Sequence, residues 1–376
     1  MRLTSAPDAG SGVDFTFNDE QEALRAAVRA FLEREAPASY RAAMADGEVG
    51  VTPELWAKIA DLGWPGLLVP EEQGGLGLGL VDMTVVLEEM GRVPLPGPFF
   101  SSAVLATLAA RALGATDQLM QLASGELRGT VALEEAGHGD PVDRVRARAR
   151  RTGADWVITG EKPLVLDGHT ADWVIVAART DEGLSSFLVE GPAGEPVPTL
   201  DPTRKASRVV LDGTVGRPLG PIGDHRNIWT RVVDDGAVML AAELVGTSDA
   251  ALALAIDYAN ARIQFDRPLA KFQAIRHKAV DMLHRAELAR VGVQYAAWTS
   301  DVDDPDRERA AAMAKSYAAE AAVYVTGEDI QIHGGVGFTW DCPAHYYFKR
   351  AKQNDVMLGY EGWQRRRLAD LLLGAA

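Results

Sequence analysis

The chain has 376 residues, of which 47% are hydrophobic and 24% charged, and its formal net charge is −15 at pH 7. This is the composition of a folded protein of two or three domains rather than of a disordered one. The acidic excess argues against nucleic acid or an anionic membrane as the main partner, although a local basic cluster can still hold a phosphate group. The single cysteine, Cys342, excludes an internal disulfide and favours a reducing compartment.

The hydropathy pattern predicts neither a targeting segment nor a membrane span. The first residues, M-R-L-T-S-A-P-D, lack the apolar core of a signal peptide. The longest apolar run, 237–255, carries Glu243 and Asp249, so we predict no membrane span. We therefore expect a cytoplasmic protein.

The N-terminal part of the chain has a helical pattern from residue 17 onward. Asn18 and Thr52 stand where helix caps are expected, and a proline follows Thr52. The stretch 69–80, V-P-E-E-Q-G-G-L-G-L-G-L, follows a helix rather than a strand, so we interpret it as a structural loop and not as a phosphate cradle. Residues 14–125 are predicted to form a helical domain.

The period of the pattern changes in residues 126–225. Short β-branched segments such as D-W-V-I-T-G-E-K and D-W-V-I-V-A-A-R, bounded by Gly, Asp or Pro, predict a compact β-barrel or sandwich. Within 144–150, four arginines alternate with Val and Ala. We interpret this alternation as the solvated face of a strand rather than as a nucleic-acid stripe.

Residues 226–376 are predicted to be helical again, and the predicted helices are 237–265, 272–299, 307–332 and 355–373. His277 and His284 lie seven residues apart on the second of these helices. No carboxylate or cysteine joins them at ligand spacing, so we predict no metal site. The glycines of G-G-V-G at 334–337 allow a backbone to approach a ligand closely, because no Cβ stands in the way.

Two segments carry a family resemblance. A-R-I-Q-F-D-R-P-L-A-K-F-Q-A-I-R-H-K-A-V-D-M at 261–282 and Q-I-H-G-G-V-G-F-T-W-D at 331–341 resemble the acyl-CoA dehydrogenase family. The P-L-P-G-P-F-F and H-Y-Y-F-K-R-A-K stretches are similar to its actinobacterial fatty-acid and steroid side-chain branch. The resemblance implies a mainly α fold with a central β domain: an N-terminal helical domain, a middle β-barrel, and a C-terminal four-helix bundle that also builds the tetramer.

The resemblance also implies an FAD enzyme that oxidises the Cα–Cβ bond of an acyl-CoA thioester. In this family a carboxylate takes the α-proton, the β-hydrogen leaves as hydride to the flavin N5, and an electron-transferring flavoprotein receives the electrons. The protein must hold the base in a desolvated pocket and position the flavin, which carries the redox chemistry.

A set of residues in the two segments is assigned to FAD by the same resemblance. Arg262 is expected at the pyrophosphate, because its planar fork can donate two hydrogen bonds to phosphate oxygens. Part of the set would contact the FAD of a neighbouring subunit. The full set is Arg262, Gln264, Phe265, Phe272, Gln273, Gln331, Gly334 and Gly335.

Two glutamates are candidates for the catalytic base. Gapless counts along the family motifs place the two known positions of the base at Leu358 and Gly236, and neither is a carboxylate. Glu361 lies three residues after the first of these, nearly one helical turn. It either reaches the site through a local shift or is an ordinary carboxylate at a helix start. Glu243, in the apolar surroundings L-A-A-E-L-V-G, either pairs with an arginine or meets the flavin.

Three further departures concern the flavin. Asp266 replaces the usual glycine after Q-F, Leu164 stands where an aromatic is expected, and L-E-E-A-G-H-G-D at 133–140 replaces a T-E-P-G-type loop. Two functions therefore stay open. The chain is either an acyl-CoA dehydrogenase for a bulky or branched acyl chain, as a homotetramer, or a catalytically inactive subunit of an α2β2 heterotetramer with a paralogue. A flavin oxidase of nitroalkanes or hydroxylamines is a third hypothesis.

Overall fold

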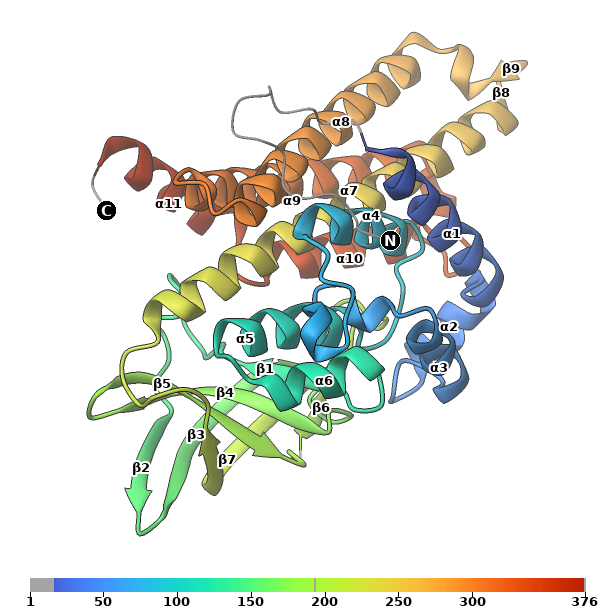
Figure 1. Ribbon diagram of the computed structural model, residues 1–376. Coiled ribbons are helices and arrows are strands. Elements are labelled where there is room, and N and C mark those ends of the chain that lie inside the picture. Colours follow the sequence, from blue (N-terminus) through green and yellow to red (C-terminus); the bar gives the residue numbers. More distant parts are fainter. Residues whose placement is uncertain (1–16, 193, 375–376) are drawn as a thin grey trace. The chain divides into compact units, whose positions relative to one another are not determined.

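The computed structural model describes residues 17–192 and 194–374, so the polar N-terminal arm lies outside the described residues. Helices, then strands, then helices follow one another along the chain, which confirms the predicted fold class (Figure 1). The chain forms two compact units, one of residues up to 39, 80–95 and from 237 onward, the other of 40–79 and 96–236. The domain boundaries at 125 and 225 stay a prediction.

The N-terminal helices begin at the predicted caps. The Asn18 side chain accepts a hydrogen bond from the backbone amide of Gln21 at 2.8 Å, and the Gln21 side chain accepts one from the backbone amide of Asn18 at 3.1 Å. Two backbone amides at the helix start, which have no acceptor within the helix, are thereby hydrogen-bonded. Thr52 accepts a bond from the Leu55 amide at 3.3 Å. The elements are α1 (Asp19–Glu35), α2 (Ala38–Asp46), α3 (Pro53–Asp61), η1 (Trp64–Gly66), η2 (Glu71–Gln73), α4 (Leu80–Arg92), η3 (Phe99–Ala106), α5 (Thr107–Ala112) and α6 (Thr116–Ser124).

The strands form one sheet that closes on itself. Around the ring, β4 pairs with β2, β2 with β3, β3 with β7, β7 with β5, and β5 with β4, while β1 extends the sheet at β4 and β6 at β7. Val145, Ala147 and Ala149 are buried and the arginines between them are exposed, which confirms the interpretation of 144–150 as a solvated face. The strands are β1 (Gly129–Ala132), β2 (Arg148–Thr152), β3 (Asp155–Leu166), β4 (Trp173–Thr180), β5 (Gly183–Glu190), β6 (Gly194–Val197) and β7 (Ala206–Pro218).

The C-terminal elements differ from the prediction at the first and last helices. The first helix, predicted at 237–265, runs from 226 to 261, where a hairpin follows it. The last helix, predicted at 355–373, begins only at 361, after a break that separates it from an unpredicted helix at 344–356 (Figure 1). The elements are α7 (Arg226–Ala261), β8 (Ile263–Gln264), β9 (Arg267–Pro268), η4 (Leu269–Lys271), α8 (Gln273–Asp301), α9 (Arg307–His333), η5 (Gly334–Phe338), α10 (Ala344–Val356) and α11 (Glu361–Leu373).

Left-handed backbone explains both corrections. Phe265 and Asp266, at the tip of the hairpin, have φ of 53° and 62°, as the two central residues of a type I′ hairpin turn require. Leu358 and Gly359, between α10 and α11, have φ of 53° and 91° and so interrupt the helix. Non-glycine residues rarely adopt this conformation, so the helices predicted from the sequence extended across both breaks.

Helix α7 is a core helix. By length and composition it is long and apolar enough to cross a membrane, but 72% of its most apolar window is buried, which is typical of the core of a folded domain. Its Gly246 lies against α4: a Cβ there would stand 1.8 Å from the carbonyl oxygen of Glu88, and a Cβ on Gly91 of α4 would stand 2.1 Å from that of Glu243. The two backbones therefore touch where both helices lack a side chain.

We predict that Gly246→Ala destabilises the protein by about 1–3 kcal/mol, because α4 and α7 must move apart. Gly292→Ala is the matched control, since it lies inside α8 and a Cβ there meets nothing within 4 Å. The control should raise stability by about 0.5–1 kcal/mol through helix propensity. Urea unfolding of both variants measures the difference, and equal stability of the two would contradict the close packing.

Candidate functional site

The residues assigned to the cofactor lie on the surface of the unit that contains the C-terminal helices. Arg262 directly follows α7, and Gln264 belongs to the hairpin, and both are exposed. Among the residues described, no hydrogen bond or ion pair engages the Arg262 guanidinium or the amides of Gln264, Gln273 and Gln331. A cation and three amides without partners in the described part of the chain can bind an anionic, hydrogen-bonding ligand.

The glycines after α9 leave room for such a ligand. Gly334 has φ of 61°, and a Cβ on either Gly334 or Gly335 would meet nothing within 4 Å. Open space beside two consecutive peptide units allows a dinucleotide to lie against the backbone. The exposed backbone and the free Arg262 guanidinium thus fit a dinucleotide such as FAD.

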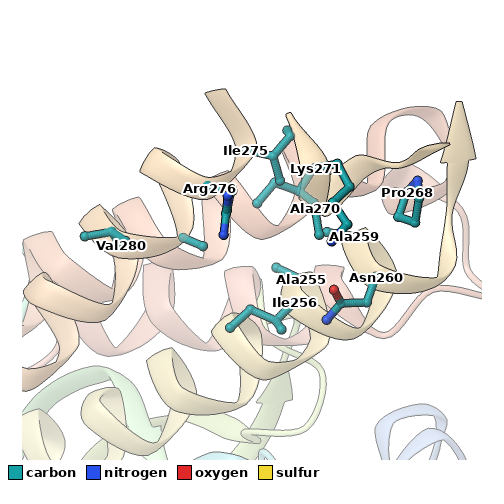
Figure 2. Close-up of a pocket in the computed structure, with 12 residues that line it drawn as sticks. Ala255, Ile256, Ala259, Asn260, Pro268, Ala270, Lys271, Ile275, Arg276 and Val280 are labelled. Atoms are coloured by element: carbon teal, nitrogen blue, oxygen red, sulfur yellow. The ribbon is translucent and has the colours of Figure 1, made fainter. Parts of the chain in front are cut away.

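A cavity of about 380 Å³ lies between the hairpin segment and the end of α9. Figure 2 shows side chains of α7 on one side of it, Ala255, Ile256, Ala259 and Asn260, and side chains of α8 on the other, among them Ile275, Arg276 and Val280. Ile332, the neighbour of Gln331, also lines it. Its size and its mostly aliphatic wall with a few polar groups are those of a small-molecule site.

The aromatic residues of the hairpin stay together although the tip is exposed. The rings of Phe265 and Phe272 lie edge to face with centroids 6.2 Å apart, and the Arg267 guanidinium lies 4.1 Å from the centroid of Phe272. Phe265 is 85% exposed. An exposed phenylalanine of this kind is a contact surface for a ligand or another chain.

In the β unit, the loop at 133–140 is held by a buried lysine. Lys162 is fully buried, and its Nζ donates to Glu135 Oε1 at 2.8 Å and to the Leu133 carbonyl at 3.1 Å. Glu135 also accepts bonds from the amides of Arg146 and Ala147, at 2.8 and 3.0 Å. Burial lowers the pKa of Lys162 to about 8. The sequence of this loop departs from the family, but its glutamate is firmly fixed.

Glu243 is engaged in a buried ion pair. Its side chain is 3% exposed and lies against the guanidinium of Arg350, which is 1% exposed, and Asn354 donates to its other oxygen at 3.2 Å. Arg350 also donates to the carbonyl of Leu95 at 3.3 Å. Of the two alternatives for Glu243, pairing with an arginine is the one present in the structure.

Glu361 is the first residue of α11. Its carboxylate forms an ion pair with Arg365, one helical turn on, with Oε1 2.7 Å from Nε, and its side chain is one-third exposed. The segment before it is fixed, because the buried Lys315 donates to the carbonyls of Asp355 and Gly359, at 2.8 and 3.3 Å. Leu358, which occupies one of the two positions expected for the catalytic base, is buried. Leu164 of β3, which stands where an aromatic residue is expected, is 37% exposed.

Sequence reasoning missed Asp329 and His333 on α9. Asp329 is fully buried, both its carboxylate oxygens lack an aligned hydrogen-bond donor, and its Oδ1 lies 3.0 Å from His333 Nδ1. Burial raises the pKa of Asp329 to about 8. The i,i+4 spacing of an acid and a histidine within an apolar helix was the available signal. In residues 17–192 and 194–374, no three His, Cys, Asp or Glu side chains are placed to hold a metal ion.

Comparison with known proteins gives consistent matches over the whole chain. The family model for the acyl-CoA dehydrogenase N-terminal domain matches residues 18–126, and that for the C-terminal domain matches 227–373. Acyl-CoA dehydrogenase IpdE2 of Mycolicibacterium smegmatis is 33% identical over 353 residues, 93% of this chain and 98% of the relative.

Two solved structures with similar folds bear the names of two-component assemblies. A variant of the steroid ACAD named Tcur3481-Tcur3483 is 32% identical with a TM-score of 0.86, covering 95% of this chain and 98% of the other. The ChsE4-ChsE5 complex from Mycobacterium tuberculosis is 29% identical with a TM-score of 0.87, covering 96% and 99%. The mycobacterial relatives confirm the predicted actinobacterial branch.

We predict that Glu243→Gln lowers the free energy of unfolding by about 3 kcal/mol, because it leaves Arg350 buried without a counter-charge. Glu361→Gln is the control and should change it by less than about 0.5 kcal/mol, since its ion pair with Arg365 is exposed. Chemical denaturation measures both. Equal, small effects would contradict the buried pair.

The raised pKa of Asp329 predicts a pH-dependent stability. The folded protein keeps a proton that the unfolded chain has lost, so this carboxyl's contribution is complete below its ordinary pKa of 3.8 and is lost as the pH rises towards 8. The loss is at most about 1.4 kcal/mol per pH unit. Asp329→Asn should remove this slope between pH 5 and 8, while exposed Asp257→Asn should keep it. Identical slopes for wild type and Asp329→Asn in urea unfolding would refute the assignment.

Proposed function

The chain belongs to the acyl-CoA dehydrogenase family, and we propose that it takes part in the FAD-dependent oxidation of the Cα–Cβ bond of an acyl-CoA thioester. The observation that carries the proposal is the exposed surface of unpaired Arg262, glutamine amides and open glycine backbone. These groups make no side-chain hydrogen bond or ion pair within residues 17–192 and 194–374, and they match the pyrophosphate and hydroxyl groups of a dinucleotide.

We assign separate tasks to the residues of this surface. Arg262 donates to the pyrophosphate, the 334–335 backbone lies along the dinucleotide, and Phe272 covers it with an apolar ring. The chemistry that bound FAD supplies is acceptance of the substrate's β-hydrogen as hydride. In the β unit, Lys162 holds Glu135 and thereby fixes the loop that faces the flavin in this family.

We further propose that this chain is a subunit of a heteromeric dehydrogenase whose partner supplies the catalytic base. A general base must be free to take the α-proton. Glu243 is neutralised by the buried Arg350, and Leu358 is not a carboxylate. Glu361 is one-third exposed and lies beside the exposed Arg365, not in the desolvated pocket that a base of this kind needs. The names of the two similar solved structures, each with two components, support the same arrangement.

The outer face of α8 offers a surface for that assembly. Val280, Leu283, Leu288 and Val291 are 47–62% exposed and lie on one side of the helix. The exposed His284 and Glu287 lie between them, and exposed apolar side chains gathered on one helix face favour burial against another chain. We propose that this stripe packs in a tetramer, with the paralogue or with a second copy.

Substrate, electron acceptor and location follow from the same premise. We propose an acyl-CoA with a bulky acyl group, as the name of one similar solved structure, a steroid enzyme, suggests. An electron-transferring flavoprotein in the cytoplasm is the proposed acceptor. A structure titled as an electron-transferring flavoprotein of Acidaminococcus fermentans, 28% identical, supports this choice.

Flavin reduction in the complex with a co-expressed paralogue tests the proposal. Anaerobic addition of a steroid acyl-CoA should bleach the flavin, and Glu361→Gln should leave the rate within about twofold of wild type. Arg262→Met should weaken FAD binding about tenfold or more, because a charge-assisted bidentate contact is lost. Arg150→Met, on the solvated face of β2, is the control and should retain FAD.

Three results would contradict it. Loss of bleaching in Glu361→Gln, with FAD retained, would return the base to this chain. Bleaching by this chain purified alone would also remove the need for a partner. Colourless protein both alone and in the complex would contradict the flavin proposal itself.

A further inference from the structure

The two cofactor-binding segments of this chain leave two different helices. One begins after α7, where the Arg262 amide donates to the Tyr258 carbonyl at 2.8 Å. The other begins after His333, the last residue of α9, at the left-handed Gly334. Within 17–192 and 194–374, no backbone hydrogen bond joins 262–273 to 331–341. Leu269 and Ala270 share a hydrophobic core with Ile332, and one further contact joins the helix ends from which the two segments start.

A ring stack makes that contact. The rings of Tyr258 and His333 lie with centroids 4.3 Å apart and planes inclined by 29°. Tyr258 is one helical turn before Arg262, and His333 is adjacent to Gly334, so the stack joins the helix ends from which both segments start. His333 is 6% exposed, which leaves its ring little freedom.

Asp329 fixes the orientation of this ring. His333 Nδ1 lies 2.9 Å from the Asp329 carbonyl oxygen and 3.0 Å from its carboxylate Oδ1. A carbonyl oxygen can only accept, so Nδ1 carries the proton and the ring is held in one tautomer. The Asp329 side chain itself is fully buried and neither of its oxygens has an aligned donor, which is a costly arrangement.

We propose that Asp329, His333 and Tyr258 form a positioning cluster that holds the two cofactor-binding segments in one preformed arrangement for the phosphates of a dinucleotide. The cluster acts through the segments and does not touch the ligand. It explains why a buried, poorly satisfied acid is placed one turn before the glycines. This inference rests on the proposed function for the identity of the ligand, but the ordering of the segments is a property of the chain alone.

Hydrogen exchange of the full-length protein without added FAD tests the ordering. Asp329→Leu and Tyr258→Ala should raise amide exchange in 262–272 and 334–341 about tenfold. Asp329→Asn keeps an acceptor oxygen and Tyr258→Phe keeps the ring, so both should exchange as wild type does. Val325→Ala, buried on the same helix, is the control for general destabilisation. Unchanged exchange in the first two variants, or an equal rise in the control, would overturn the proposal.

Titration of the same proteins with FAD, with the paralogue present, tests the consequence. Asp329→Leu and Tyr258→Ala should bind FAD at least about tenfold more weakly, and the two conservative variants should bind it normally. Wild-type affinity in the disordered variants would overturn the link to the cofactor. If wild type binds no FAD, the proposed function fails, and the exchange data alone decide whether the cluster orders the segments.

Discussion

A buried carboxylate needs a cation beside it, and this constraint decides how Glu243 can be used. The cost of removing a charge from water is several kcal/mol, so a glutamate in the middle of α7 is stable only with a counter-charge. Arg350 of α10 provides it, and Asn354 and the Leu95 carbonyl satisfy the remaining groups. The pair ties α7 to α10 and gives Glu243 a counter-charge within the chain. Glu361 lies one-third exposed beside Arg365, so neither candidate is an unpaired carboxylate in a desolvated pocket.

The opposite situation holds at the cofactor surface. Among the described residues no anion pairs with Arg262, and the amides of Gln264, Gln273 and Gln331 are exposed and make no hydrogen bond there. The charge of Glu243 is balanced by Arg350, whereas we propose that a ligand balances the charge of Arg262. Asp329 differs from both, because it is buried and its carboxyl oxygens have no aligned hydrogen-bond donor. Its contact with His333 gives a physical reason for keeping it: the ring of His333 meets Tyr258, and the two ligand-binding segments begin on either side of that stack.

The sequence predicted features that depend on local chemistry. The caps at Asn18 and Thr52 and the alternation in β2 follow from neighbouring residues, and all three are confirmed. The hairpin after α7 and the break before α11 were missed, because they depend on left-handed Phe265, Asp266 and Leu358, for which side-chain type gives no warning. The partner of Glu243 is 107 residues away and could not be deduced, since pairing at that separation is decided by packing.

The same distinction between local pattern and distant partner applies to the candidate site. The cofactor set stays a prediction from residue types and spacings that form a recognisable pattern, whereas the state of Glu243 depends on a partner far along the chain. We propose that this chain binds the cofactor and that another chain takes the proton. The most direct measurement is a structure of the complex with FAD and a non-reactive acyl-CoA analogue. A carboxylate of the partner within hydrogen-bond reach of the α-carbon is the predicted result. Glu361 or Glu243 of this chain at that position would contradict the account.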